Sequence, residues 1–300
     1  MKYWINMNAE NRFGQIKRVL IYVLILNWLV AFAKLALGYT IKSSSMVADG
    51  YHSLSDGASN IIGFLGIWLA SRPKDESHPY GHKKYETFAS IGIAFLLFFV
   101  CIGIVHESIG RFKNPVLPNA NILSFIVMFT TLAVNFAVML YEYRAGRRLN
   151  SDILVADSAH TKADILTSLS VIGALFAVKA GWPFLDPLIA IFIAAFILYV
   201  AFEILRDSAV VLCDSAVIDT KKIEAVVMAI EGVLSAHKIR TRGRCDDVHV
   251  DLHVLVKNDM RMDSAHKLSY KIEEEIRNKI SGVSDVVIHM EPSSGEIKTP

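Results

Sequence analysis

Two ten-residue stretches repeat the same polar residues inside apolar sequence. "VADGYHSLSD" begins at Val47 and "VADSAHTKAD" begins at Val155, and both read V-A-D-x-x-H-x-x-x-D. In each copy the histidine and the second aspartate are four residues apart, which places both on one face of a helix. Imidazole nitrogens and carboxylate oxygens together suit a divalent cation such as zinc. The candidate ligands of one four-coordinate site are therefore His52, Asp56, His160 and Asp164.

The segments that carry the repeat have the length and composition of membrane-spanning helices. Of the 300 residues 53% are hydrophobic, and the mean hydropathy is +0.40. A helix needs about 20 apolar residues to cross the hydrocarbon core of a bilayer. Six segments qualify: residues 19–41, 46–70, 87–109, 121–142, 153–178 and 183–205. The two copies of the repeat lie in the second and the fifth of these segments.

Carboxylates in such helices need a partner. One ionised carboxylate near the bilayer centre costs about 2.5–3.5 kcal/mol on insertion scales, and four unpaired ones would cost on the order of 10 kcal/mol. A bound divalent cation offsets this cost. The first aspartate of each copy, Asp49 or Asp157, lies about one turn from the ligands. For it three interpretations stay open: a second-shell group that orients the ligands, a relay, or a polar contact at a helix end. Asn135 in the fourth segment is expected to form an interhelical hydrogen bond rather than to be a ligand.

The basic residues predict the orientation of the six spans. An even number of spans places both termini on one side of the membrane. Eleven Lys and Arg residues lie on that side, in the N-terminal tail and two loops, and four lie on the opposite side. Because Lys and Arg accumulate in cytoplasmic loops, we expect both termini to be cytoplasmic.

After the sixth span the sequence becomes that of a small polar domain. We divide the chain into a cytoplasmic tail (1–18), a six-helix transmembrane domain (19–208), a cytoplasmic metal-binding and dimerisation domain (209–292) and a short tail (293–300). Helices are predicted at 220–231 and 263–280, and strands at 236–241, 248–256 and 285–290. The order αββαβ predicts a small α+β domain, ferredoxin-like or metallochaperone-like, with its helices on one face of the sheet. The fold class is thus an α-helical membrane protein with an α+β C-terminal domain.

Two further groups of histidines and carboxylates lie outside the spans. The loop "PKDESHPYGHKK" contains Asp75, His78 and His82 within eight residues. In the C-terminal domain, "VHVDLHVLV" alternates apolar residues with polar ones, which predicts a half-buried strand with a polar face. The potential ligands of this domain are His237, His253, His266, His289 and Glu291. Both groups are candidate metal sites. The alternative is that these histidines are solvated polar residues, as isolated histidines usually are.

Composition and motifs weigh against several classes of protein. A net charge of +2 gives no reason to expect a nucleic-acid partner. The three cysteines form no CxxC pair, so neither a disulfide framework nor a thiolate zinc site is expected. His106 and Glu107 begin like the zinc-protease motif HExxH, but its last position is Gly110. We therefore expect neither an enzyme nor an organic cofactor.

These motifs, taken in order, resemble the cation diffusion facilitator family, and among its members the bacterial zinc/iron efflux proteins. The resemblance rests on six spans, HxxxD in spans two and five, "DESHPYGHKKYE" in the loop and "DVVIHMEP" near the C-terminus, and it covers residues 15–292. It implies a homodimer in the lipid bilayer of the bacterial inner membrane. It also implies export of Zn(II), with Cd(II) or Fe(II) as other substrates, from the cytoplasm in exchange for protons.

The resemblance further implies roles for individual residues. The repeat would supply the transport site, the loop would hold a second ion, and the C-terminal ligands would form a binuclear regulatory zinc site at the dimer interface. Lys84 and Asp214 would form a charge interlock between the two domains. Well-known bacterial relatives carry aspartate in place of His52, and commonly aspartate in place of Glu291. The imidazole at position 52 should favour zinc over manganese, whereas the longer glutamate leaves the geometry of the tail site open.

Three functional interpretations remain from the sequence. Proton exchange by alternating access fits because only neutral imidazole binds a metal and its pKa is about 6.5. An Fe(II)- or Mn(II)-preferring transporter of the same family would use the same ligands. So would a uniporter that moves no protons.

Overall fold

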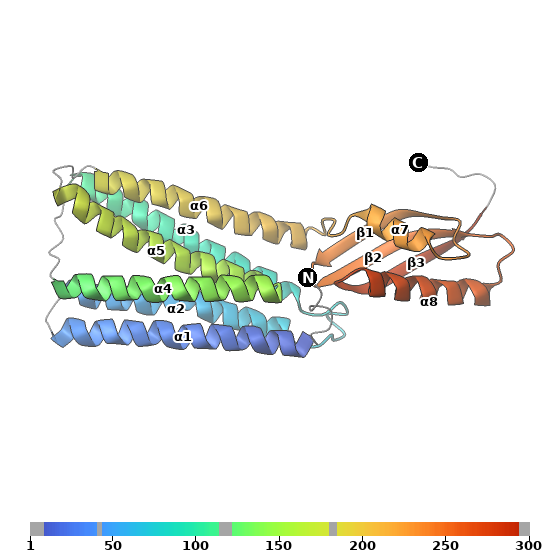
Figure 1. Ribbon diagram of the computed structural model, residues 1–300, viewed down its shortest axis with the longest axis horizontal. Coiled ribbons are helices and arrows are strands. Elements are labelled where there is room, and N and C mark those ends of the chain that lie inside the picture. Colours follow the sequence, from blue (N-terminus) through green and yellow to red (C-terminus); the bar gives the residue numbers. More distant parts are fainter. Residues whose placement is uncertain (1–8, 41–43, 114–121, 180–184, 294–300) are drawn as a thin grey trace. The chain divides into compact units, whose positions relative to one another are not determined.

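The computed structural model describes residues 9–40, 44–113, 122–179 and 185–293, in two units that divide between Ser208 and Ala209 (Figure 1). The described part of the first unit contains the helices α1 (Ala9–Thr40), α2 (Ser44–Ala70), α3 (Lys84–Lys113), α4 (Ile122–Leu149) and α5 (Asp152–Lys179), and α6 (Leu185–Leu212), which runs on into the second. The second unit contains α7 (Thr220–Met228), β1 (Ser235–Arg244), β2 (Asp247–Val256), α8 (Met262–Lys279) and β3 (Val283–Pro292).

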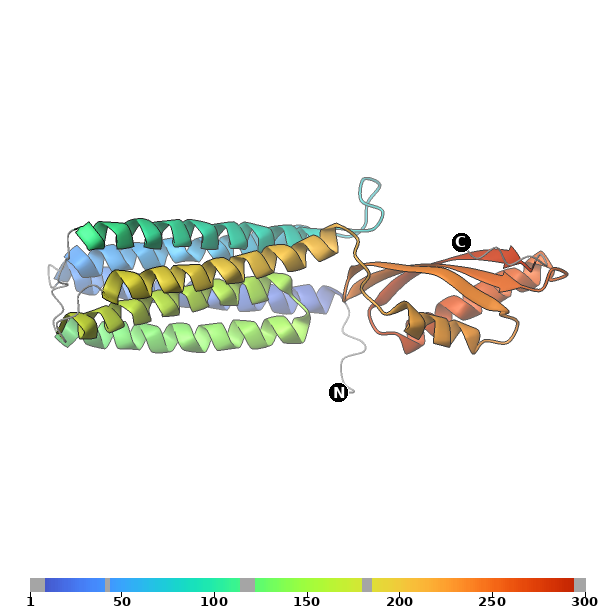
Figure 2. The ribbon, with the colours of Figure 1, turned by 90° about the horizontal axis from the view of Figure 1, so that it is seen from above.

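The helical unit is a bundle in which the long helices lie side by side (Figures 1 and 2). Among the described residues, three stretches are long and apolar enough to cross a membrane: Asn11–Leu37, Lys84–Gly110 and Pro187–Leu212. They belong to α1, α3 and α6. Helices α2 and α5 carry the polar repeats, which interrupt their apolar sequence. The predicted helical transmembrane domain with its small α+β domain is confirmed.

Two apolar clusters hold the bundle together. The larger one joins α1, α2, α4 and α5 through fully buried side chains such as Ile16, Ile67 and Ile153. The smaller one packs α3 and α6 against α5 through Leu97, Ala163 and other buried residues. Helix α5 contributes buried residues to both clusters, so the second copy of the repeat lies on a helix that joins them.

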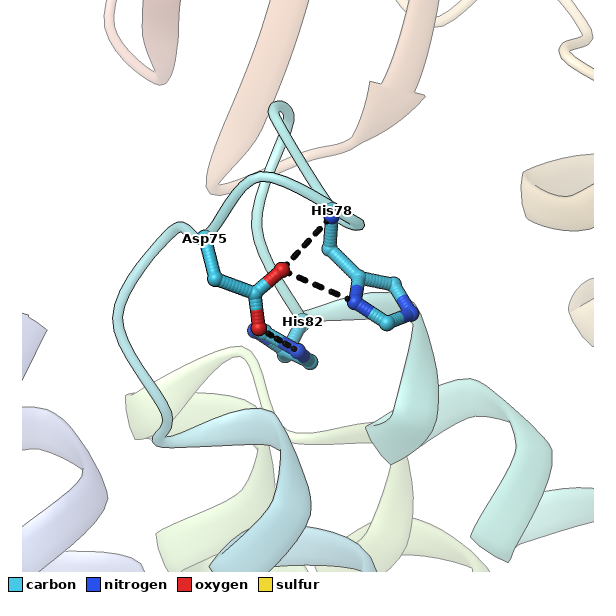
Figure 3. Close-up of side chains that lie close together, drawn as sticks. All are labelled: Asp75, His78 and His82. Carbon is cyan, nitrogen blue, oxygen red and sulfur yellow. Dashed lines mark hydrogen bonds and ion pairs between the residues drawn. The ribbon is translucent and has the colours of Figure 1, made fainter.

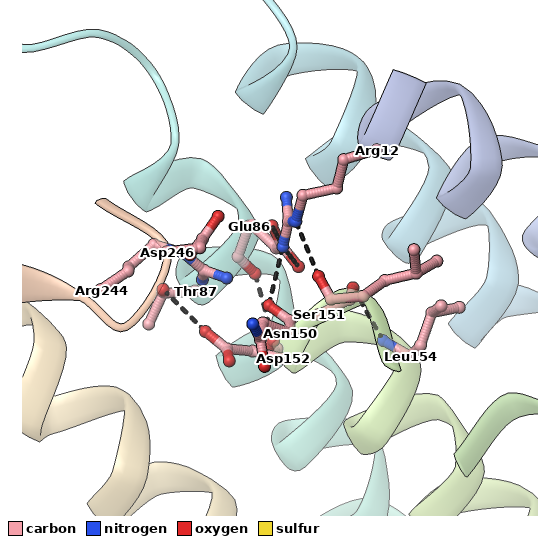
Figure 4. Close-up of polar contacts among 11 residues, drawn as sticks. Arg12, Glu86, Thr87, Asn150, Ser151, Asp152, Leu154, Arg244 and Asp246 are labelled. Carbon is pink, nitrogen blue, oxygen red and sulfur yellow. Dashed lines mark hydrogen bonds and ion pairs between the residues drawn. The ribbon is translucent and has the colours of Figure 1, made fainter. Parts of the chain in front are cut away.

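Helices α1 and α4 extend beyond their predicted ends because their polar residues find partners. Helix α1 begins at Ala9, inside the segment predicted as a polar tail. There Arg12 is buried, and its guanidinium lies 3.0 Å from the carboxylate of Glu86 on α3 (Figure 4). The same guanidinium donates to the carbonyl oxygens of Leu149 and Asn150, each at 2.7 Å. Arg12 therefore ties α1 and α3 to the end of α4.

A tight turn then fixes α5 against α4. Asn150 has a left-handed φ of 48°, and the Ser151 amide donates to the Gly146 carbonyl at 2.9 Å, which together form a Schellman ending. The Ser151 hydroxyl accepts from the amide of Leu154 at 3.4 Å and so caps α5. A Cβ at Gly146 would lie 3.0 Å from the backbone nitrogen of Val155, so the two helices approach closely.

The smaller unit is a three-stranded sheet in the order β1-β2-β3, with β1 antiparallel and β3 parallel to β2. Val248, Val250, Leu252 and Val254 of β2 are buried against the helices. Helix α7 packs on β1, α8 packs on β3, and both lie on one face of the sheet (Figure 2). The alternate residues of β2, His249 and His253 among them, point to the opposite face. The predicted order of elements and the single helical face are confirmed.

The buried ion pair gives the first prediction. Glu86→Gln leaves the Arg12 charge buried without its partner, and we expect a loss of about 3–5 kcal/mol in the free energy of unfolding. The matched control is Asp207→Asn, which removes an exposed pair with Arg206 and should cost less than about 1 kcal/mol. Denaturant titration of the full-length protein in detergent measures both, and equal losses would contradict the assigned role.

Candidate metal-binding sites

Three of the four predicted transport ligands line one cavity between α1, α2, α4 and α5. Asp56 comes from α2, and His160 and Asp164 come from α5. The cavity has a volume of about 20 Å³, which is enough for a water molecule or an ion. The remaining lining residues are Asn27, Val30, Ser53, Ser59, Thr131, Asn135 and Thr161. The two copies of the repeat thus meet at one place.

The ligand geometry is clearest on α5. His160 is 5% exposed, and its Nδ1 lies 3.6 Å from Oδ2 of Asp164, one turn further along the helix. These two side chains present a nitrogen and an oxygen to the cavity that Asp56 faces from α2. The side chains of Asp49 and His52 lie outside the described part of the structure, although both residues belong to α2. His52 therefore remains the predicted fourth ligand, and Asp49 remains a predicted neighbour.

Amide side chains enlarge the set of possible ligands. Asn135, expected to form a hydrogen bond between helices, lies on the cavity wall, and so does Asn27 of α1. Sequence reasoning missed Asn27, although an amide inside an apolar segment is the same signal that drew attention to Asn135. Both residues offer an uncharged oxygen beside the two carboxylates and the imidazole.

Asp157 lies away from this cavity and belongs to a buried polar network. It is 1% exposed, which distinguishes it from a solvated group at a helix end. The amide of Asn60 donates to Asp157 Oδ2, and Asn27 donates to Asn60 Oδ1 at 3.2 Å. The Thr161 hydroxyl donates to Glu142 Oε2 at 3.0 Å. Glu142 was missed because the sequence placed it at the very end of the fourth apolar segment, whereas α4 continues past it to Leu149.

The loop between α2 and α3 brings its three predicted ligands together (Figure 3). Asp75 Oδ1 lies 3.1 Å from His78 Nδ1, and Asp75 Oδ2 lies 3.4 Å from His82 Nε2. One ligand atom from each residue lies within 4.8 Å of the others. The backbone amide of His78, which donates to Asp75 at 2.7 Å, and the nearby imidazoles hold the pKa of that carboxyl below its usual value. Asp75 is therefore ready to bind a cation.

The open face of the small sheet carries a row of three histidines. His237 of β1 pairs with His253 of β2, which pairs with His289 of β3. Glu291 lies beside all three: its oxygens are 2.6 Å from His253 Nδ1, 3.2 Å from His237 Nε2 and 3.7 Å from His289 Nε2. Atoms of His237, His253 and Glu291 lie within 4.8 Å of one another. Strand register therefore assembles a metal-ligand set from three separate segments.

Hydrogen bonding lowers the pKa of Glu291, the carboxylate of this row. The bond with His253 comes first, and the charges of His237, His253 and His289 add to it, so the pKa of Glu291 is held below its usual value. Glu291 thus remains ionised when the pH falls far enough to protonate the histidines. Loss of metal on acidification should therefore follow the imidazoles, which must be neutral to coordinate.

His266 does not lie with the other predicted tail ligands, and Lys84 and Asp214 belong to different units. His266 lies on α8, exposed and beside Tyr270, whereas the other tail ligands lie on the face of the sheet that the helices leave open. It remains a predicted ligand for a site shared between protomers. Lys84 begins α3, and Asp214 lies 3.9 Å from Arg242 in the smaller unit. The predicted charge interlock would join residues of two different units, and it stays a prediction.

Comparison with protein families defines the class, a membrane-embedded transporter of divalent metal cations with a C-terminal dimerisation domain. A family model for the cation efflux transmembrane domain matches residues 20–213, and one for the cytoplasmic domain of cation efflux proteins matches residues 217–293. The chain belongs to the cation diffusion facilitator family, whose members export such cations.

Similar proteins come from distant organisms. An uncharacterized transporter of Methanocaldococcus jannaschii is 31% identical over 276 residues, 91% of this chain and 95% of that protein. The manganese efflux system protein MneP of Bacillus subtilis is 29% identical over 289 residues, 92% of this chain and 96% of that protein. MneS of the same organism, also named a manganese efflux system protein, is 30% identical over 269 residues, 86% of this chain and 89% of that protein.

The histidine row predicts the behaviour of the tail site. His253→Ala removes the ligand at its centre and should weaken zinc binding on the order of 10–100-fold or more, since even residues that only orient a ligand have effects of this size. Isothermal titration of the full-length protein with zinc chloride measures it, and wild-type affinity should fall on acidification, because only neutral imidazole binds a metal. His249→Ala, on the same strand but next to Asp285, is the control. Equal zinc affinity in the two variants would show that the row is not a metal site.

Proposed function

We propose that the chain exports Zn(II) from the cytoplasm in exchange for protons, by alternating access at the cavity between α1, α2, α4 and α5. The observation that carries the proposal is that Asp56 and Asp164, 108 positions apart in the sequence, line one cavity together with His160. Further support comes from the burial of His160, which is 5% exposed. In this proposal both termini face the cytoplasm of a bacterial inner membrane.

Proton exchange follows from the chemistry of the ligands. Imidazole binds a metal only when neutral, and carboxylates bind it only when ionised, so an incoming cation displaces protons from both. When the cavity opens to the outside, protons compete for His160, Asp164 and Asp56 and release the cation. A uniporter would use the same ligands without this exchange.

The choice of metal rests on the donor set. Nitrogen from His160, with the predicted nitrogen of His52, favours zinc over harder cations. A second candidate, Mn(II), is supported by the amides of Asn27 and Asn135 on the cavity wall and by the names of the Bacillus subtilis relatives. Carboxylate and amide oxygens suit manganese.

The C-terminal domain is assigned a regulatory role in a homodimer. Its histidine row lies on the open face of the sheet, where a second copy could approach and supply further ligands such as His266. Zinc bound there would hold two protomers together when the cytoplasmic concentration is high. The loop site of Asp75, His78 and His82 would bind a further ion near the cytoplasmic ends of the spans.

Transport in proteoliposomes tests the proposed site. Asp56→Ala and Asp164→Ala should each lower zinc flux under an imposed pH gradient by at least about tenfold, since each removes a charged ligand. Glu203→Ala, an exposed carboxylate on α6, should transport like the wild type. A pH-sensitive dye inside the vesicles should report proton movement opposite to zinc. Unchanged flux in both variants would refute the site, and zinc flux without proton movement would indicate a uniporter.

Substitution on the cavity wall separates the two metals. Asn135→Leu removes an oxygen donor of similar size while the imidazole and both carboxylates remain. We expect manganese transport to fall by at least about tenfold and zinc transport to change less, because manganese depends more on oxygen ligands. Flux measured metal by metal decides this, and equal losses for both metals would contradict a ligand role for the amide.

A further inference from the structure

Glu142 of α4 and Asp157 of α5 form a second buried polar centre beside the cavity. Their side chains belong to residues that are 0% and 1% exposed, and neither lines the cavity that holds the metal ligands. The Thr161 hydroxyl lies 3.0 Å from Oε2 of Glu142 and 3.2 Å from the backbone oxygen of Asp157, so it brings the two residues side by side, and their carboxyl groups interact with each other. We propose that they share one proton and form a proton-binding site that is separate from the metal ligands.

The hydrogen bonds around the pair explain why a proton would bind between the two carboxyl groups. Thr161 donates to Oε2 of Glu142, and Asn60 donates to Oδ2 of Asp157. The other two oxygens, Oε1 of Glu142 and Oδ1 of Asp157, accept no hydrogen bond from the described residues, since the hydroxyl of Ser59, which also interacts with Asp157, donates to the Asp56 carbonyl at 3.1 Å. Two adjacent carboxylates cannot both ionise at low cost in a dry interior. A protonated carboxyl becomes a donor, and one shared proton satisfies both remaining oxygens.

The same geometry disfavours a metal ion at the pair. The two carboxyl groups come with one amide and one hydroxyl, each of which donates a hydrogen bond to a carboxylate oxygen. A cation would have to replace these donors and would need space between the helices, whereas neither carboxyl lines the described cavity. A proton needs no such space.

Other titratable groups act on the pair from its surroundings. Asp164 interacts electrostatically with Glu142, and His160 with Asp157, both from α5. Asp56 of α2 acts on His160 in turn. Helices α1 and α2 otherwise face the network with the amides of Asn27 and Asn60. A change of charge in the metal cavity therefore changes the electrostatic energy of the pair, although neither carboxyl group would contact the ion.

Two hydrogen-bonded paths join the pair to the cavity. Thr161 donates to Glu142 and also lines the cavity. On the other side Asn60 links Asp157 to Asn27, which lines the cavity as well. A role in transport rests on the proposed proton exchange: the pair would supply a proton that moves when the cavity changes its occupant. The shared proton itself does not depend on that function.

Infrared spectroscopy tests the shared proton directly. The carbonyl stretch of a protonated carboxyl group should be visible at neutral pH in the full-length protein in detergent. It should be lost or displaced in both Glu142→Gln and Asp157→Asn, which keep size and hydrogen bonding, and unchanged in the exposed control Glu203→Gln. Absence of the band from the wild type, or a band that either substitution leaves unchanged, would overturn the proposal.

Counting protons tests the role in transport. In proteoliposomes, Glu142→Gln should move fewer protons per zinc than the wild type, and Glu203→Gln should move the same number. An unchanged proton count in Glu142→Gln would overturn the coupling role. If Asp164→Ala left zinc flux unchanged while the infrared band persisted, the proposed function would fail and the proton site would stand.

Discussion

Burying ionisable groups between apolar helices is the constraint on which the rest of this structure depends. Each such group must have a partner, because a lone charge in low dielectric costs several kcal/mol. The bundle meets this demand in three ways. Arg12 is paired with Glu86 and backbone carbonyls, Asp157 and Glu142 are held in a hydrogen-bonded network, and Asp56, His160 and Asp164 gather around one cavity. A cation bound in the cavity would be a further partner for these groups.

Backbone geometry sets these partners in place. The turn at Asn150 and Ser151 directs α5 back along α4, and the close approach at Gly146 keeps the two helices in contact. This contact places Glu142 beside Asp157 and Thr161, and it carries His160 to the cavity. In the smaller unit the same ordering comes from strand register, which aligns three histidines across the sheet. In both units, residues far apart in sequence become neighbours through regular elements rather than through flexible loops.

Many of these elements and candidate ligands could be predicted from local sequence patterns. Apolar length predicts the helices, alternation predicts β2, and a repeated spacing of four predicts that His160 and Asp164 share a helix face. What could not be predicted depends on tertiary packing. Glu142 stood at the end of a predicted span, and nothing local shows that Thr161 donates a hydrogen bond to it inside the bundle. The segment around Arg12 was predicted as a polar tail because Glu86, the partner of Arg12, lies 74 positions away. The row of histidines could be suspected from composition, but its alignment depends on register.

The central claim is that the repeat binds the transported ion. Its most direct test is X-ray absorption at the zinc edge for full-length protein in which His82→Ala and His253→Ala have removed the other two sites. The account predicts one bound zinc with four nitrogen and oxygen ligands at about 2.0–2.1 Å, including imidazole scattering that weakens when His160→Ala is added. Absence of stoichiometric zinc, or a spectrum that His160→Ala leaves unchanged, would contradict it.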